Sequence, residues 1–213
     1  MNIMMIDCSP KITESNSGYF LDILSKFIDE KDISKYKLVK NQGYENIINN
    51  ILNVEILVIA FPIYVDSIPS HLLRFLTFIE EEFKGELKDI KVYVVANCGF
   101  YEGIQNKVAL NIMKCWCKTM NLNWGQGIGI GSGEMMGGLK NIPIDKGPNK
   151  SLGNALKILA NNINSNESGE DIYTNPTGFP RLAFKLAANR TWVINAKRNG
   201  VTKKELDKCM VKQ

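Results

Sequence analysis

The residues best suited to chemistry in this sequence lie in three polar or aromatic segments, and the first is CSPKITESNSG at residues 8–18. It contains a dense set of hydrogen-bonding side chains, namely Ser9, Lys11, Thr13, Ser15, Asn16 and Ser17. Apolar residues at helical spacing follow, so the segment leads into a helix. A helix N-terminus presents unpaired N–H groups and a partial positive charge, which together bind anions such as phosphate. We therefore predict an anion site here.

A simpler interpretation is that Ser15 or Ser17 only caps this helix. A cap needs one such residue, whereas three consecutive candidates stand at residues 15–17, so we favour the anion site. The segment contains neither the GxGxxG pattern of dinucleotide-binding sites nor the GxxxxGK[ST] pattern of P-loops.

The second segment, FPIYVDSIP at residues 61–69, offers a flat aromatic face through Tyr64. Pro62 ends an apolar run, Ser67 is a candidate helix cap, and Pro69 suits the first turn of a helix. A single tyrosine is more often an ordinary half-buried residue. The position of Tyr64 directly after a strand pattern nevertheless favours a ligand contact.

The third segment, NCGFYEG at residues 97–103, combines polar and aromatic groups. Gly99 permits close backbone approach, Phe100 and Tyr101 add aromatic surface, and Asn97 offers hydrogen bonds. Taken alone, this segment is equally well a turn with chance aromatic residues. The three segments together provide an anion cradle, an aromatic platform and a polar edge. These match the phosphate, the flat ring and the pyrimidine rim of flavin mononucleotide (FMN), which we predict as the cofactor.

Alternating strand and helix patterns are expected to position these segments. Apolar runs predict strands at residues 1–6, 36–39, 55–61, 90–96 and 124–130, and helical spacing predicts helices within 19–28, 47–52, 72–83, 104–120 and 152–163. Such alternation indicates a doubly wound, five-stranded parallel sheet between two layers of helices, a three-layer α/β/α flavodoxin-like fold. Ligands in this architecture bind outside the carboxyl ends of the strands, where the three segments lie.

Charge separates the C-terminal part from the rest. The chain of 213 residues has a net charge of +4, and residues 181–204 contain seven basic and no acidic residues, so the first 180 residues carry about −3. We expect an FMN-binding domain at residues 1–165. A basic C-terminal extension follows at 166–213, expected to be helical and to pack on the body or on a sister subunit.

Composition bounds the remaining possibilities. No apolar run is long enough for a membrane span and no signal peptide is recognisable, which favours the cytoplasm and no integral membrane contact. The five cysteines are scattered, and the closest pair, Cys115 and Cys117, would point apart on a helix. We therefore expect free thiols at Cys8, Cys98, Cys115, Cys117 and Cys209, and no metal site.

The segments resemble motifs of a known family. SPKITESNS resembles the S-P-R/K…S/N-S phosphate loop of the NAD(P)H-dependent FMN reductases and related quinone reductases of the flavodoxin-like superfamily. PIYVDSIP resembles their P-x-Y-x-x-S-x-P segment, and NCGFYEG resembles a flavin-rim loop found in a subgroup of flavodoxin-family oxidoreductases. The resemblance spans most of residues 1–165, and the compact cysteine cluster of the iron–sulfur relatives is missing.

The resemblance implies three sets of cofactor-binding residues. Phosphate contacts are implied from Ser9, Lys11, Ser15, Asn16 and Ser17; isoalloxazine contacts from Pro62, Ile63, Tyr64 and Val65; and rim contacts from Asn97, Cys98, Gly99 and Phe100. Family members often have glycine where this chain has Cys8, so the start of the loop is expected to be tighter or differently angled beside Ser9.

The leading hypothesis is an oxidoreductase that passes hydride from NAD(P)H through FMN to a small acceptor, such as a quinone, a flavin or a nitroaromatic compound. No protein acid or base is required, and His71 is interpreted as a surface residue and not as a proton relay. The glycine-rich residues 127–150 form either a lid, with Met135 and Met136 as an apolar wall, or a mobile surface loop. A homodimer or higher homo-oligomer is expected.

Two alternatives stay open. A flavodoxin-type electron carrier would bind FMN without a substrate of its own, but such carriers are strongly acidic and this sequence has a pI of about 8.7. A flavin-free interaction or membrane-surface module is suggested by residues 179–200, where Leu182, Leu186 and Val193 alternate with basic residues. Nucleic acid is not expected as a partner, because no stacking platform accompanies the basic residues.

Overall fold

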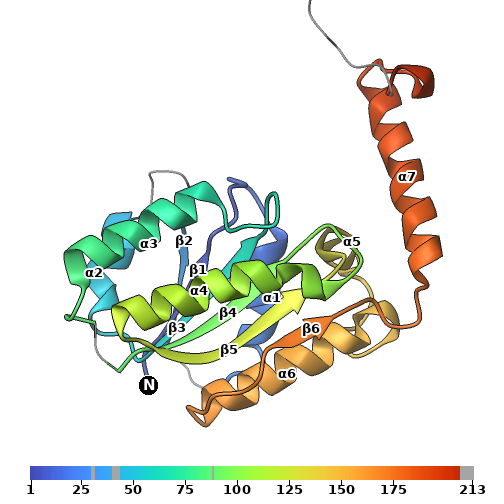
Figure 1. Ribbon diagram of the computed structural model, residues 1–213. Helices are drawn as coiled ribbons and strands as arrows, with labels where there is room; N and C mark the ends of the chain where they lie inside the picture. Colours follow the sequence, from blue (N-terminus) through green and yellow to red (C-terminus); the bar gives the residue numbers. More distant parts are fainter. Residues whose placement is uncertain (30–31, 40–43, 88, 207–213) are drawn as a thin grey trace, which may run out of the picture. The chain divides into compact units, whose positions relative to one another are not determined.

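The computed structural model describes residues 1–29, 32–39, 44–87 and 89–206 (Figure 1). The chain divides into two compact units, Met1–Thr177 and Gly178–Gln213, which we call the body and the tail. The tail is described as far as residue 206, so the thiol expected at Cys209 lies outside the described residues.

The body is built on a parallel sheet in the order β2-β1-β3-β4-β5-β6. Its strands are β1 (Ile3–Asp7), β2 (Ile33–Lys37), β3 (Ile56–Pro62), β4 (Lys91–Asn97), β5 (Asn123–Ile130) and β6 (Ile172–Thr174). Its helices are α1 (Asn16–Ser25), α2 (Tyr44–Ile51), α3 (Ser70–Phe83), α4 (Lys107–Met120), α5 (Gly133–Gly138) and α6 (Lys150–Asn164), with 3-10 turns η1 (Gly103–Asn106) and η2 (Gly147–Asn149). The expected doubly wound α/β fold is confirmed, with six strands in place of five.

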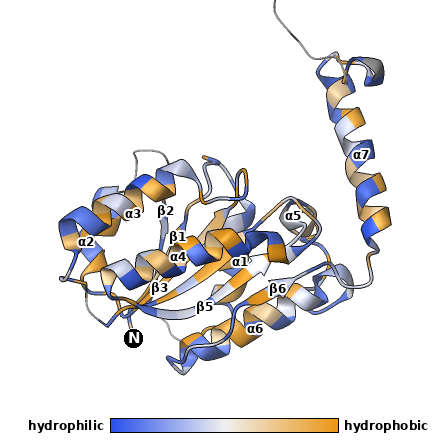
Figure 2. Cartoon of the chain, viewed as in Figure 1, coloured by the Kyte–Doolittle hydropathy of each residue, from blue (hydrophilic) through white to orange (hydrophobic). Residues whose placement is uncertain are grey.

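Helices cover both faces of the sheet because its strands are apolar on both sides. Successive strand residues point to opposite faces. Met4 and Ile6 accordingly belong to a core cluster with side chains of α2, α3 and α4, whereas Ile3 and Met5 belong to a second cluster with α1 and α6. Figure 2 shows this distribution as hydrophobic residues along the central strands and on the helices around them. Each fully buried aliphatic side chain contributes roughly 1.5–3 kcal/mol.

The sixth strand corrects the expected domain boundary. Residues 172–174 pair with β5 in register Ile128↔Ile172, so the body continues to Thr177 instead of ending at residue 165. Asp171 anchors this segment: its carboxylate forms an ion pair with Lys114 at 2.6 Å and accepts the Trp124 indole N–H at 3.2 Å. A three-residue strand is too short to show a periodic pattern, which is why the sequence did not indicate it.

The tail contains α7 (Arg181–Arg198) and the 3-10 turn η3 (Lys203–Glu205). None of the residues of α7 is buried. The side chains of Leu182, Leu186 and Trp192 are 69%, 63% and 71% exposed. Among the described residues, no helix has both the length and the apolar character needed to cross a bilayer.

Candidate functional site

The carboxyl edge of the sheet brings the three predicted segments together. The chain leaves β1 for β2 on one side and later returns to β3 on the other, so the segments after β1 and β3 diverge and a ligand crevice is expected between them. The amide of Asn97, at the end of β4, donates to the Ser17 hydroxyl oxygen and to the Phe61 carbonyl, each at 3.0 Å. One buried side chain therefore links the three predicted segments, 8–18, 61–69 and 97–103.

The loop after β1 is organised around Asp7, the last residue of that strand. One carboxylate oxygen accepts the Ser9 N–H at 3.0 Å, and the other accepts the Ser15 hydroxyl at 2.7 Å. The Ser15 oxygen in turn accepts the Gly18 N–H at 2.9 Å. Ser15 is therefore the N-cap of α1, as the simpler interpretation held, and the Ser9 amide and the Ser15 hydroxyl are already engaged within the loop.

Other donors of this loop stay available. Within the described ranges, no protein acceptor contacts the backbone N–H groups of Asn16 and Ser17, which lie in the first turn of α1. Ser17 is 1% exposed; its hydroxyl accepts from Asn97 and keeps its own proton, which it can donate only to a group that reaches the start of α1. Lys11 is exposed, whereas the Asn16 amide is turned to the Gly133 carbonyl at 3.1 Å. Two amides, one hydroxyl and one ammonium group thus remain for an anion.

The loop after β3 presents its aromatic residue outward. Tyr64 and Ser67 exchange backbone hydrogen bonds of 3.0 and 3.2 Å, which close a tight turn, and Val65 has a φ of 50°. This left-handed conformation is unfavourable for a β-branched residue. Tyr64 is 50% and Val65 98% exposed, so both can contact a ligand.

Other residues of this loop face elsewhere. Ile63 is 9% exposed and packs in the core, so its side chain is not available to a flavin ring, whereas Pro62 is half-buried. Ser67 does not cap the following helix, because α3 begins after Pro69 without a side-chain cap.

The loop after β4 offers an aromatic surface and backbone groups. Phe100 is 54% exposed and Gly99 is also exposed. The Cys98 thiol turns inward, where it receives the Asn106 amide at 3.4 Å, and burial raises the pKa of this thiol. The Cys98 thiol is therefore neutral and part of the packed interior, so only the backbone of this residue can contact a ligand.

The glycine-rich residues 127–150 are not a structureless loop, because they include the end of β5, α5 and η2. Helix α5 lies against the start of α1: a Cβ atom at Gly137 would fall 2.0 Å from the Asn16 side-chain oxygen, and one at Gly133 would fall 2.8 Å from that of Asn97. Met136 is 1% exposed and belongs to the core, while Met135 is half-buried. Only Met135 is therefore placed to line a site.

His71 is buried, so the expectation of a surface residue is wrong. Its ring Nε2 lies 3.1 Å from the Cys8 carbonyl oxygen, and the ring also hydrogen-bonds to the backbone of Leu38. Burial lowers the pKa of His71 and outweighs these two hydrogen bonds, which raise it. The neutral imidazole thus supports the loop from behind, and a lone histidine at a helix start gave no signal of this role.

Two charged residues beside the loop, Asp7 and Lys37, were also missed. Lys37 ends β2, and its ammonium group donates to the carbonyls of Ile12 and Thr13 at 3.2 and 2.5 Å. It lies 3.7 Å from the Asp7 carboxylate. Both residues end strands that are neighbours in the sheet, and that position at a carboxyl edge was the available signal.

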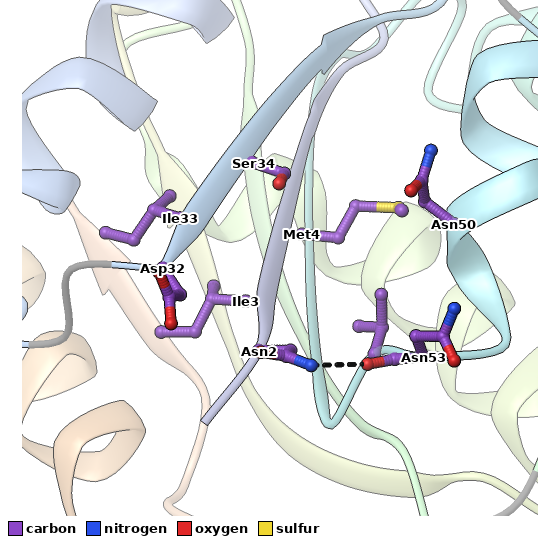
Figure 3. A pocket seen from close by; sticks show the side chains of 9 residues that line it. Asn2, Ile3, Met4, Asp32, Ile33, Ser34, Asn50 and Asn53 are labelled. Atoms are coloured by element: carbon purple, nitrogen blue, oxygen red, sulfur yellow. Dashed lines mark hydrogen bonds between the residues drawn. The ribbon is translucent and has the colours of Figure 1, made fainter.

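A cavity of about 360 Å³ lies at the opposite end of the sheet (Figure 3). It is lined by the first residues of β1 and β2 and by the residues around the end of α2, and the Asn2 amide donates to the Asn53 carbonyl at 3.0 Å within it. Asp32 is the one charged residue of its lining. The cavity therefore lies away from the loops that carry the free donors and exposed aromatic rings.

The groups at the carboxyl edge fit a ligand with one anionic end and a flat ring. The free amides and the hydroxyl at the start of α1 suit a phosphate, and Tyr64 and Phe100 supply exposed aromatic faces. The Asp7 carboxylate does not occupy the free donors, because its oxygens accept hydrogen bonds from the Ser9 N–H and the Ser15 hydroxyl. FMN has this combination of parts.

No protein-family model matches the sequence, and no curated protein matches it. Solved structures do resemble it. An NADPH-quinone reductase from P. pentosaceus superposes with a TM-score of 0.57 at 15% identity, covering 75% of this chain and 98% of the other. An NADH:FMN oxidoreductase in its apo form has a TM-score of 0.57 at 16% identity, covering 79% of this chain and 91% of the other. An oxidoreductase from Corynebacterium diphtheriae has a TM-score of 0.57 at 14% identity, covering 78% of this chain and 96% of the other.

These structures are oxidoreductases of the kind that the sequence motifs resemble. Each covers 75–79% of this chain, and at identities of 14–16% only the arrangement of the elements is shared. The chain therefore has the flavodoxin-like fold that these oxidoreductases use.

Proposed function

We propose that the protein is an FMN-dependent oxidoreductase that takes electrons from NAD(P)H and passes them to a small acceptor of the quinone, flavin or nitroaromatic class. The observation that carries the proposal is the link made by Asn97, which joins Ser17 to Phe61 and so gathers three ligand-competent loops at the switch point of the sheet. The similarity to an NADPH-quinone reductase and an NADH:FMN oxidoreductase supports it.

When bound, FMN would supply the redox chemistry by accepting hydride from the nicotinamide and returning electrons to the acceptor. The residues of this chain would bind and orient. The amides of Asn16 and Ser17 and the Ser17 hydroxyl would hold the phosphate. Tyr64 and Phe100 would contact the ring, and the backbone at Gly99 would contact its polar rim. The sequence resemblance implied these residues and also Ser9, Lys11, Ser15, Pro62, Ile63, Val65, Asn97 and Cys98.

The chain supplies no proton donor or acceptor for the reaction in this proposal. The His71 imidazole is engaged by backbone groups behind the loop, and the Cys98 thiol is buried with a raised pKa. Neither group is free to exchange protons with a substrate. Catalysis would thus depend on positioning and on exclusion of water from the ring face, which the half-buried Met135 and helix α5 could provide.

The visible absorption spectrum of the purified protein with FMN tests the proposal. Binding should shift the visible flavin bands and quench FMN fluorescence at micromolar protein, and anaerobic NADH or NADPH should then bleach those bands. Ser17→Ala should weaken FMN binding by about tenfold, because it removes one phosphate donor and also the acceptor of the Asn97 amide. Ser25→Ala, at the far end of α1, is the matched control and should leave binding unchanged.

Absence of FMN binding would refute the proposal. Binding without reduction by either nicotinamide would instead favour an electron carrier that is reduced only by a partner protein. The two outcomes are separated in one titration, since flavin quenching precedes the addition of the nicotinamide.

For partners, we propose a small-molecule acceptor and a second copy of this chain. The tail supports self-association because helices in proteins are stabilised mostly by packing of an apolar face, and α7 carries exposed Leu182, Leu186 and Trp192. Its basic charge also complements the net charge of about −3 on the first 180 residues. Light scattering after size exclusion should give at least a dimer, and Leu182→Glu with Leu186→Glu should shift it to the monomer. An unchanged mass would reject this partner.

A further inference from the structure

The loop that is proposed to hold the FMN phosphate already contains an anion. Asp7 has a side chain 11% exposed, and its carboxylate receives the Ser15 hydroxyl, the N-cap of α1, at 2.7 Å. A Cβ atom at Gly18 would lie 3.0 Å from the same carboxylate oxygen, a tight contact that a larger residue could keep only if the carboxylate shifted. The carboxylate therefore lies within the positive field of the helix N-terminus, where a phosphate would also be stabilised.

A cation on the neighbouring strand offsets this charge. The Lys37 ammonium group lies 3.7 Å from the Asp7 carboxylate and donates to the carbonyls of Ile12 and Thr13 on the outer part of the loop. Its side chain is 33% exposed, so the pair is only partly screened by solvent. Lys37 thus contacts both the buried carboxylate and the backbone of the loop that would surround the phosphate.

We propose that Asp7 and Lys37 form a charge pair that sets the preference of this site for a phosphorylated flavin over the same flavin without its phosphate. The inference rests on the proposed FMN site and goes beyond it by naming the residues that determine specificity. Asp7 disfavours a second anion at the start of α1, and Lys37 restores the balance by neutralising Asp7. The two residues therefore act on phosphate affinity with opposite signs, although both hold the loop together.

Riboflavin is the comparison ligand, because it shares the ring and ribityl chain of FMN and lacks only the phosphate. The measured quantity is the ratio of the riboflavin Kd to the FMN Kd, obtained by fluorescence quenching on the full chain. Effects on ring binding cancel in this ratio. A change in the ratio therefore reports on the phosphate alone.

Opposite shifts are expected from the two neutral substitutions. Asp7→Asn should raise the ratio by about tenfold, since it removes the competing anion and leaves Lys37 unpaired beside the phosphate. Lys37→Met should lower it by about tenfold, since it leaves an uncompensated carboxylate there. The double substitution should return the ratio to within about threefold of the unmodified protein, because the two charges are removed together.

Two further variants serve as controls. Lys37→Arg keeps the charge and should keep the ratio within about twofold. Lys35→Met removes another cation from β2. Lys35 forms an exposed ion pair with Asp22 at 2.6 Å, so its loss should leave the ratio unchanged. If Asp7→Asn does not fold, as judged by circular dichroism, the effect of Lys37→Met is measured at rising salt: a charge effect on the ratio shrinks as salt screens it, whereas a loosened loop leaves the effect unchanged.

A purely structural role predicts a different result. If the pair only holds the loop, Asp7→Asn and Lys37→Met should shift the ratio in the same direction or not at all, and that outcome overturns the inference. Failure of the unmodified protein to bind either flavin would overturn the proposed function as well. Binding of FMN without opposite shifts would leave the proposed function standing and remove only the charge pair.

Discussion

The two ends of the sheet differ in what they bury. The amino end has the cavity, which is lined partly by polar side chains. Two of these, Asn2 and Asn53, are exposed. The carboxyl end has buried polar side chains with defined partners, among them Asp7, Asn97 and His71. Burying a polar group is unfavourable unless it is hydrogen-bonded, so such groups at one edge indicate an ordered site more reliably than volume does.

Among the substitutions considered, removal of the Asn97 side chain should have the largest effect on stability and on flavin binding. Asn97→Ala deletes two hydrogen bonds from a residue that is 4% exposed and leaves the Phe61 carbonyl without this donor. The free energy of unfolding should fall by about 2–3 kcal/mol, and FMN affinity should fall by more than tenfold because the three loops are no longer linked. Urea denaturation and flavin titration measure the two effects. A loss of less than about 0.5 kcal/mol would contradict the role assigned to this amide.

Acidification should weaken the carboxyl edge through His71. Burial lowers its pKa in the folded protein, so the unfolded chain binds the proton more tightly. The contribution of His71 to stability is therefore complete above the unfolded pKa of about 6.5 and declines as the pH falls toward the lower folded value, by at most about 1.4 kcal/mol per pH unit.

The substitution His71→Gln tests this dependence, because His71 is the only histidine of the chain. The variant should be less stable than the original protein at pH 8, where Gln replaces a fitted imidazole. The difference should shrink toward pH 5, since Gln does not titrate. Carboxylates titrate in both proteins and cancel in the comparison. A difference that stays constant or grows on acidification would contradict the assigned shift.

The amino end should respond least. Asn2→Ala removes one hydrogen bond, to the Asn53 carbonyl, between exposed residues. Water can replace the lost donor, so the free energy of unfolding should change by less than about 0.5 kcal/mol, with FMN affinity unchanged. Parallel measurements with Asn97→Ala would sharpen the comparison between the two edges. A flavin effect at Asn2 would mean that the cavity takes part in binding.

Much of the body follows from local sequence pattern. The apolar runs at β1, β3 and β4 are long enough to require burial on both faces, and the alternation with helices then leads to a parallel sheet. Once that sheet is accepted, the segments 8–18, 61–69 and 97–103 must meet at its carboxyl edge, and Asn97 does link them.

Within the site, the sequence determined which loops would meet, and the tertiary structure decided which atoms they present. Ile63 and Cys98 follow strands as their neighbours do, yet their side chains turn inward. β6 pairs with β5 directly after Asp171, whose carboxylate contacts Lys114 and Trp124. Ser15 is engaged by Asp7 and Cys8 by His71. Each of these outcomes depends on contacts that form only in the folded chain, and a local pattern has no information about such contacts until the sheet has formed.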